Sequence, residues 1–198
     1  MIDVIDHLAG IEPDSPLDHL REQRPDAREH AQRAFDALLT PDVPGEVSLV
    51  ERDAVAAFVT GLHQDPRTAR FYADRLAELA PELLGAVRLE IEAASTTGPY
   101  GSYPADGPLA AESDEGLRYR TRDPEALGAR LAAAFEHAHL LVFRPREAGP
   151  KDLRALADAD WSVTGIVTLS QLVAFLSFQI RVVAGLRLLG ATQKGTTS

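Results

Sequence analysis

The sequence predicts an all-α fold, and three observations lead to this prediction. Apolar residues recur at three- and four-residue steps along most of the chain, which is the spacing of an amphipathic helix. Proline and capping residues separate these runs, and no stretch shows the turn-bounded alternation that indicates a strand. With 198 residues and 45% hydrophobic content, the chain can bury a substantial core. We expect one domain over residues 1–198, a bundle of about eight or nine helices.

The helices of the N-terminal half, residues 15–95, begin at recognisable signals. Ser15 followed by Pro16 is an N-cap with proline at the first helical position. Ser48 and Glu51 have the spacing of a capping box, and the helix behind them should end near His63. The expected breaks between the helices of this half lie at Pro25, residues 40–46, Asp65-Pro66 and Pro81.

A change of composition separates the two halves. Residues 96–123 are rich in Gly, Pro and acidic residues and show no sustained period, so we expect a long loop. Loops of this length inside a domain are usually functional or mobile, so this one is expected to act as a lid or an arm. Tyr100 and Tyr103 are candidates to anchor it on the body or on a partner subunit.

The C-terminal half, residues 124–190, ends in the stretch around which we expect the chain to be organised. Ser162 to Leu189 should form one long helix stopped by Gly190, and no residue between Gly165 and Ile180 carries a charge. We therefore expect this helix to be central and buried on most sides. A second stripe of the same helix carries small and hydroxyl residues, which suits close helix contact in a homo-oligomer, and it consists of Ser170, Ala174, Ser177 and Arg181.

Composition excludes several classes of function. The formal net charge of −10 argues against a nucleic-acid-binding surface. The chain has no cysteine, which excludes disulfides, thiolate metal sites and cysteine nucleophiles in this chain. Acidic residues near the N-terminus are unlike a secretory signal, and the uncharged part of the long helix is shorter than a membrane span. The sequence thus predicts a cytoplasmic protein without nucleic-acid or membrane partners, and it indicates no cofactor.

Several segments resemble one protein superfamily. The stretch SLVERDAVAAFVTGL resembles the helix that opens the core of AhpD-like and carboxymuconolactone decarboxylase proteins. The stretch LRALADADWSVTGIVTLSQLVAFLSFQIRVVAGL resembles the turn and long helix of peroxidase-related members. Together with GPYGSYPADGPLA and LGARLAAAFEHAHLLVFRPREA, the chain looks similar to the subgroup named CMD domain proteins. The resemblance covers about Ser15 to Gly190 and implies an AhpD-like helical bundle.

The chain departs from that family at its redox motif. Peroxidase members carry a C-x-x-C-x-x-x-H segment after the Glu of the first helix, and one thiolate attacks the hydroperoxide. At the family's spacing from Glu51, the two Cys positions fall on His63 and Pro66, and the His position falls on Arg70. Because no register supplies a thiol, we expect no thiol-dependent peroxidase activity.

Two candidate catalytic residues lie on the first core helix. Glu51 would be a general base in the family role, but an N3 Glu in a capping box also simply satisfies the backbone of Ser48. His63 would face a pocket, or it would close the helix C-terminus, where a protonated imidazole suits the dipole.

His137 and His139 form a second constellation in the segment EHAH. Two residues apart on a helix, they point in different directions and do not chelate one metal ion together, so we predict no metal site. We expect one imidazole to be buried and its neighbour exposed, and the inward one to be a usable acid or base. Arg181, with Ser177 beside it, would either pair with Glu51 or Glu136 or hold the carboxylate of a substrate.

Two hypotheses about function follow. The first is a cysteine-free enzyme of the decarboxylase-like branch that performs acid/base chemistry on a small organic acid. In it, Arg181 holds the carboxylate, and Glu51 and a histidine move the proton. The second is a non-catalytic or accessory subunit that pairs with a Cys-bearing relative.

Overall fold

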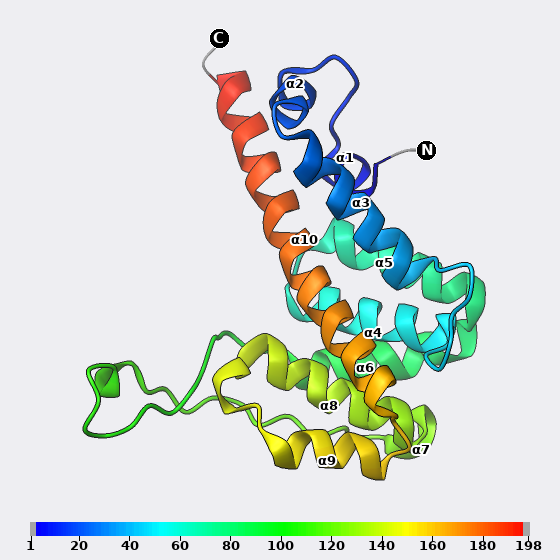
Figure 1. Cartoon of the computed structure of the whole chain (residues 1–198), viewed down its shortest axis with the longest axis vertical. Helices are drawn as coiled ribbons and strands as arrows, with labels where there is room; N and C mark the ends of the chain where they lie inside the picture. The colour runs from blue at the N-terminus through cyan, green and yellow to red at the C-terminus, as the bar shows by residue number, and fades with distance from the viewer. Residues whose placement is uncertain (1–2, 196–198) are drawn as a thin grey trace.

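The computed structural model describes residues 3–195 and is all-α, as the sequence predicts (Figure 1). Within these residues there are ten α-helices and no strand, only one isolated bridge between Gly101 and Asp114. The helices are α1 (Val4–Ala9), α2 (Pro16–Glu22), α3 (Pro25–Leu39), α4 (Leu49–Leu62), α5 (Pro66–Leu79), α6 (Leu84–Ala94), α7 (Pro124–Leu127), α8 (Ala129–Phe143), α9 (Pro150–Asp158) and α10 (Val163–Gly195).

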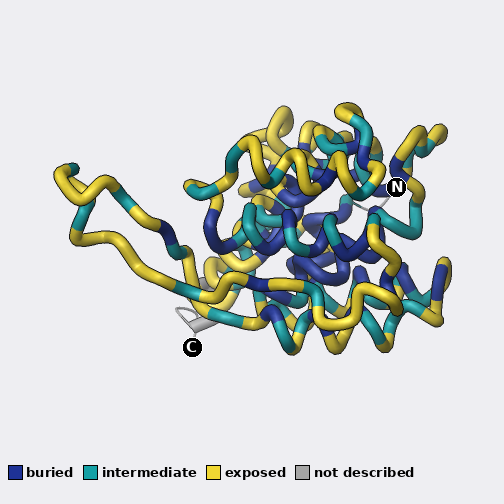
Figure 2. The backbone as a smooth tube through the Cα atoms, turned by 90° about the horizontal axis from the view of Figure 1, so that it is seen from below, coloured by how far each residue is buried: buried dark blue, intermediate teal, exposed yellow. Residues whose placement is uncertain are grey.

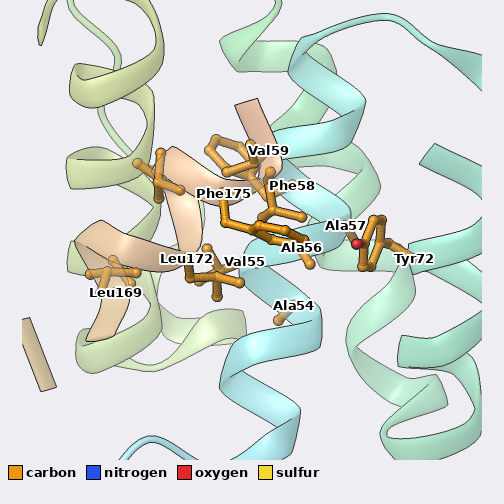
Figure 3. Close-up of a cluster of buried hydrophobic side chains, with 14 of the residues drawn as sticks. Ala54, Val55, Ala56, Ala57, Phe58, Val59, Tyr72, Leu169, Leu172 and Phe175 are labelled. Atoms are coloured by element: carbon orange, nitrogen blue, oxygen red, sulfur yellow. The ribbon is translucent and has the colours of Figure 1, made fainter. Parts of the chain in front are cut away.

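Helix α4 lies at the centre of the molecule. Every residue from Arg52 to Thr60 is buried, and α5, α6, α8 and α10 surround the helix (Figure 3). The segment AVAAFV, residues 54–59, is apolar around the whole helix, so no face of α4 is suited to water. Its ring of Phe58 stacks on Phe135 of α8, with ring centroids 4.2 Å apart. The central buried helix is therefore α4.

Charged residues on α4 are buried because each finds partners. Asp53 is fully buried and accepts two hydrogen bonds from Arg75, at 2.7 and 3.0 Å. Burial raises the pKa of Asp53, and the Arg75 guanidinium opposes that shift. The guanidinium of Arg52 donates to three backbone carbonyls, those of Val47, Leu38 and Pro44, and so holds the loop before α4. Buried polar groups that are paired in this way cost little stability.

Helix α10 differs from the expectation in two respects. It packs one face on the body through residues such as Leu172 and Leu176, but its other face is exposed, so it is not buried on most sides. It also continues through Gly190 to Gly195, because Gly190 stays helical and does not adopt the positive φ of a helix-ending glycine. By length and composition α10 could cross a membrane. However, 39% of its most apolar 18-residue stretch is buried within the molecule.

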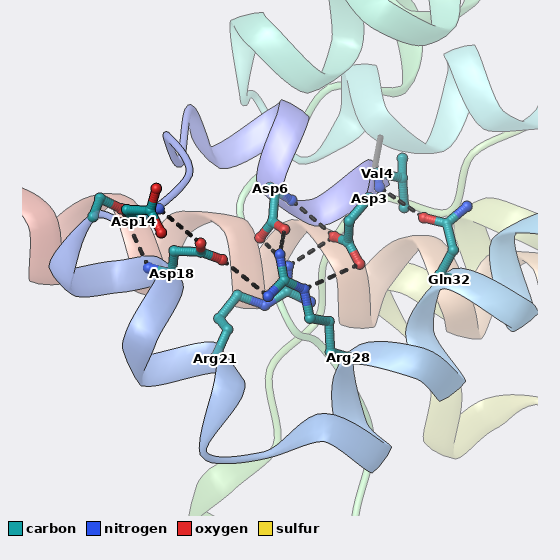
Figure 4. Close-up of polar contacts among 9 residues, drawn as sticks. Asp3, Val4, Asp6, Asp14, Asp18, Arg21, Arg28 and Gln32 are labelled. Atoms are coloured by element: carbon teal, nitrogen blue, oxygen red, sulfur yellow. Dashed lines mark hydrogen bonds and ion pairs between the residues drawn. The ribbon is translucent and has the colours of Figure 1, made fainter. Parts of the chain in front are cut away.

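The N-terminal end contains a helix that the sequence did not indicate to us. The short helix α1 is held by an ion network in which Asp3 and Asp6 both pair with Arg21 of α2 (Figure 4). Arg28 of α3 pairs with Asp6 and with Asp18, so three helices meet at one cluster of charges. In the second half, the expected single helix after Asp123-Pro124 is split into α7 and α8 by Gly128, which has a φ of 77°.

Residues 95–123 form an arm that leaves the body and returns to it (Figures 1 and 2). Most of the arm is exposed, and its only helical part is a short 3₁₀ turn, Ala110–Glu112. Its root is anchored: the Tyr100 amide donates to the Phe143 carbonyl at 2.6 Å, and Arg146 lies 4.2 Å from the Tyr103 ring centroid. The returning chain is anchored on Glu90, which is buried and accepts from the Tyr119 hydroxyl at 2.6 Å.

Candidate functional site

A cavity of about 120 Å³ lies between α8, α9 and the chain that returns from the arm. Its walls combine cationic, anionic and imidazole side chains with a few apolar ones. The lining residues are Arg118, Tyr119, Arg120, Ala133, Glu136, His137, His139, Leu140, Arg144, Glu147, Lys151, Asp152 and Ala155. Both histidines of the EHAH segment thus line one cavity, together with charged residues from three other segments.

His137 is buried and has only one of its two ring nitrogens paired. It is 5% exposed, and its Nε2 lies 3.3 Å from the Ser170 hydroxyl of α10. Its Nδ1 is buried and has no hydrogen-bond partner among the residues that the structure describes. Burial lowers the pKa of His137, and the charge of Asp152 opposes this effect weakly. The ring is therefore neutral at pH 7 and has one unpaired nitrogen.

His139 lies on another side of α8 and has a different environment. Its Nε2 is 3.2 Å from the carbonyl of Ala94, and its ring packs against those of Tyr119 and Phe143. Burial lowers its pKa to about 4. The expectation that one of the two histidines would be exposed is wrong: His139 is 2% exposed and His137 only slightly more. Both are buried because α8 packs against α4, α9 and α10, and because the Ala94 carbonyl of α6 and the Tyr119 ring of the arm contact His139.

Charged residues at the cavity form ion pairs with one another. Glu147 accepts from Arg144 at 2.9 Å and pairs with Arg118 at 3.1 Å. Arg120 pairs with Glu136. Lys151, in contrast, has no ion pair within the described part of the chain. Lys151 also lines an adjoining outer groove, together with Ser102, Tyr103, Pro104, Arg118, Arg146 and Glu147.

The sequence did not lead us to predict the charged residues that line this cavity. They lie in the arm, in α8 and in α9, and no local spacing connects them. In the sequence, the acidic and basic residues of the arm indicated only that this segment is a loop. The usable signal was the EHAH segment itself, because a buried imidazole needs a partner or a ligand.

Glu51 is separate from this cavity and acts as a helix cap. Its carboxylate accepts from the Ser48 amide at 2.8 Å and completes the capping box at the start of α4. It also forms an ion pair with Arg130. These bonds are the structural role that was weighed against general-base chemistry, and Glu51 lies at the opposite end of α4 from His63, about 18 Å along the helix.

His63, Ser177 and Arg181 form a second, smaller cluster. The His63 Nε2 lies 3.3 Å from the Ser177 hydroxyl, and Arg181 donates to the Ser177 carbonyl at 3.2 Å. Burial, and secondly the charge of Arg181, lower the pKa of His63. Of the two alternatives for Arg181, the ion pair with Glu51 or Glu136 is wrong, because Glu51 pairs with Arg130 and Glu136 with Arg120. Arg181 is exposed and has no carboxylate partner among residues 3–195.

The structure therefore divides the predicted site residues into three places. His137 and His139 line the cavity. His63, at the end of α4, lies next to Ser177 and Arg181 of α10, and Glu51 caps the start of α4. In the described part of the chain, no three acidic or histidine side chains converge in a way that would hold a metal ion. The sequence matches no protein-family model and no curated protein.

Proposed function

We propose that this chain binds a small organic acid in the cavity at His137 and performs acid/base chemistry on it without a thiol. The observation that carries the proposal is the unpaired Nδ1 of a neutral, buried imidazole in the wall of a charged cavity. A ligand with a polar or acidic hydrogen is the partner that this atom lacks. The resemblance to the decarboxylase-like branch supports the same class of chemistry.

The roles of the residues follow from their contacts. If Nε2–H of His137 donates to Ser170, Nδ1 has a free lone pair and serves as the general base. Lys151, which no carboxylate of the described residues engages, is suited to hold the carboxylate of a ligand in the cavity. Burial keeps the imidazole unprotonated at neutral pH, so it is ready to accept a proton.

A panel of small mono- and dicarboxylic acids tests binding by thermal shift. A ligand at 100 times its dissociation constant stabilises a protein by about 2.7 kcal/mol, which is readily measured. Lys151→Met should weaken the shift, while Arg70→Met, a change on the exposed face of α5, should leave it intact. Absence of any shift across the panel would contradict the proposal and favour the accessory-subunit alternative.

Proton transfer needs a separate measurement. In deuterated water, a bound acid should exchange the hydrogen on the carbon next to its carboxylate, and NMR follows this exchange. His137→Gln should abolish the exchange and still allow binding, because Lys151 remains. Exchange at the wild-type rate in His137→Gln would refute the base role.

A further inference from the structure

The exposed face of α10 carries a mainly apolar stripe that includes one amide and one charged side chain. We call it the α10 stripe, and its members all lie within about 100° of one another around the helix. The stripe consists of Val163, Val167, Gln171, Ala174, Phe178, Arg181, Gly185 and Leu188, all of them exposed. Val163 is 81% exposed, Leu188 68% and Phe178 47%. No described element of the chain covers these side chains.

The side-chain sizes and the charge along the stripe are complementary to those of an identical stripe that runs in the opposite direction. About a midpoint level with Leu176, large Phe178 faces small Ala174, and Val167 faces Gly185. The single charge, Arg181, faces the neutral amide of Gln171. Val163 at one end meets Leu188 and Leu189 at the other. From Val167 to Gly185, each bulky or charged member thus has a small or polar counterpart, while apolar side chains meet at the two ends.

We propose that two copies of this chain associate through the α10 stripe, with the two helices antiparallel about a two-fold axis level with Leu176. A two-fold interface uses the same surface on both copies, so the surface must be self-complementary, which this stripe is. The contact extends from Val163 to Leu188, about 37 Å along each helix. Small residues at Ala174 and Gly185 let large side chains of the other copy enter, as in close helix packing.

The parallel arrangement is excluded by the same pattern. It would place Arg181 against Arg181 of the other copy, and like charges in direct contact are unfavourable. It would also place Phe178 against Phe178 of the other copy. Ala174 would face Ala174 and Gly185 would face Gly185, and these small residues would leave gaps between the helices. In the antiparallel register, Arg181 gains the carbonyl oxygen of Gln171 as an acceptor, besides the Ser177 carbonyl within its own helix.

A second copy fits the stripe better than a lipid surface does. The opposite face of α10 is buried against α1, α3, α4 and α8, so the helix cannot enter a bilayer without leaving the body. The stripe is also interrupted by Gln171 and Arg181, which is costly in hydrocarbon. The proposal does not depend on the function proposed for the His137 cavity.

Sedimentation equilibrium of the full chain tests the interface. Wild type should be a dimer, and Phe178→Glu, which places a charge near the two-fold axis, should raise the dimer dissociation constant by at least about 100-fold. Leu89→Glu is the matched control, because Leu89 is 57% exposed on α6, and it should leave the constant unchanged. Far-UV circular dichroism spectra equal to that of wild type would show that both variants are folded. A monomeric wild type, or a dimer insensitive to Phe178→Glu, would overturn the proposal.

Gln171→Glu tests the register. In the antiparallel dimer, each new carboxylate faces Arg181 of the other copy, and the two ion pairs should tighten association by about fivefold. In a parallel dimer the two carboxylates would face each other and weaken association. A weakened dimer in Gln171→Glu therefore refutes the antiparallel register.

Cross-linking gives an independent readout, since the chain has no native cysteine. A mixture of Gln171→Cys and Arg181→Cys chains should form mixed disulfides on oxidation, while neither variant alone should cross-link efficiently. Vesicles of neutral and anionic lipid complete the test. If wild type is monomeric and binds vesicles, and Phe178→Glu does not, the stripe binds lipid and the proposal fails.

Discussion

Acid should destabilise this protein through its buried histidines, and His139 allows the size of the effect to be worked out. The pKa of His139 is 6.5 in an unfolded chain and about 4 in the folded protein, because burial disfavours the charged imidazole. Between these two values the unfolded chain binds a proton that the folded protein does not. Stability therefore rises with pH in this window and falls as the pH is lowered.

The expected loss follows from the same two values. Lowering the pH from 7 to 5 should reduce the free energy of unfolding by about 2 kcal/mol through His139 alone, and by about 3 kcal/mol once the pH is below 4. Burial also lowers the pKa of His63 and of His137, so both add to the loss with the same sign. Urea unfolding at a series of pH values from 5 to 7 measures the slope directly.

Two variants isolate the contribution of His139. His139→Gln removes the titrating group, so its stability should depend less steeply on pH, although the change of packing lowers its stability at pH 7. His30→Gln changes an exposed histidine on α3 and should keep the wild-type slope. If His139→Gln and wild type lose the same free energy between pH 7 and 5, the assignment of a buried neutral imidazole is wrong.

Three further predictions concern buried carboxylates and the missing thiol. Glu90→Leu leaves the Tyr119 hydroxyl and the Arg122 and Asp123 amides without an acceptor, so unfolding midpoints in urea should show a loss of about 3 kcal/mol, and limited proteolysis should cut the arm faster. Asp53→Leu should cost about 2–3 kcal/mol by the same assay, since Arg75 is left unpaired but partly exposed. Metal-free protein should not reduce an alkyl hydroperoxide with any dithiol; turnover in a peroxide-consumption assay would contradict this.

Local signals in the sequence predicted most of the helix boundaries. The Ser15, Ser48 and Asp65 side chains each accept from a backbone amide at the start of a helix, as capping residues do. Two boundaries were wrong, both at glycines. Gly128 adopts a positive φ that no pattern announces, and Gly190 does not adopt one although its position suggested it. Backbone conformation at glycine depends on the packing of the surrounding chain, which the sequence does not display.

The order of burial was harder to predict than the helices. The uncharged run in α10 suggested a central position, but the helix that the others surround is α4, which carries Arg52 and Asp53. That inference treated charge as a property of single residues. Asp53 is buried because Arg75 of another helix pairs with it, and Arg52 because its guanidinium donates to three backbone carbonyls. The spacing of apolar residues along one helix does not show such partners from other elements. These partners nevertheless decide whether a helix with charged residues can be buried.

The two histidines of α8 show which part of the candidate site the sequence contained. Two residues apart on a helix, their side chains point in directions about 200° apart around the helix axis. The spacing alone therefore gives the two rings different neighbours. What the sequence lacked was the polar partner of each ring. The Ala94 carbonyl faces Nε2 of His139, and the ring is enclosed by Tyr119 and Phe143, which makes it a part of the core. The Ser170 hydroxyl engages only one nitrogen of His137 and leaves Nδ1 unpaired. Nδ1 of His137 is the nitrogen that is buried without a partner among the described residues, and the assignment of acid/base chemistry to His137 rests on this missing hydrogen bond, because both rings are buried and neutral.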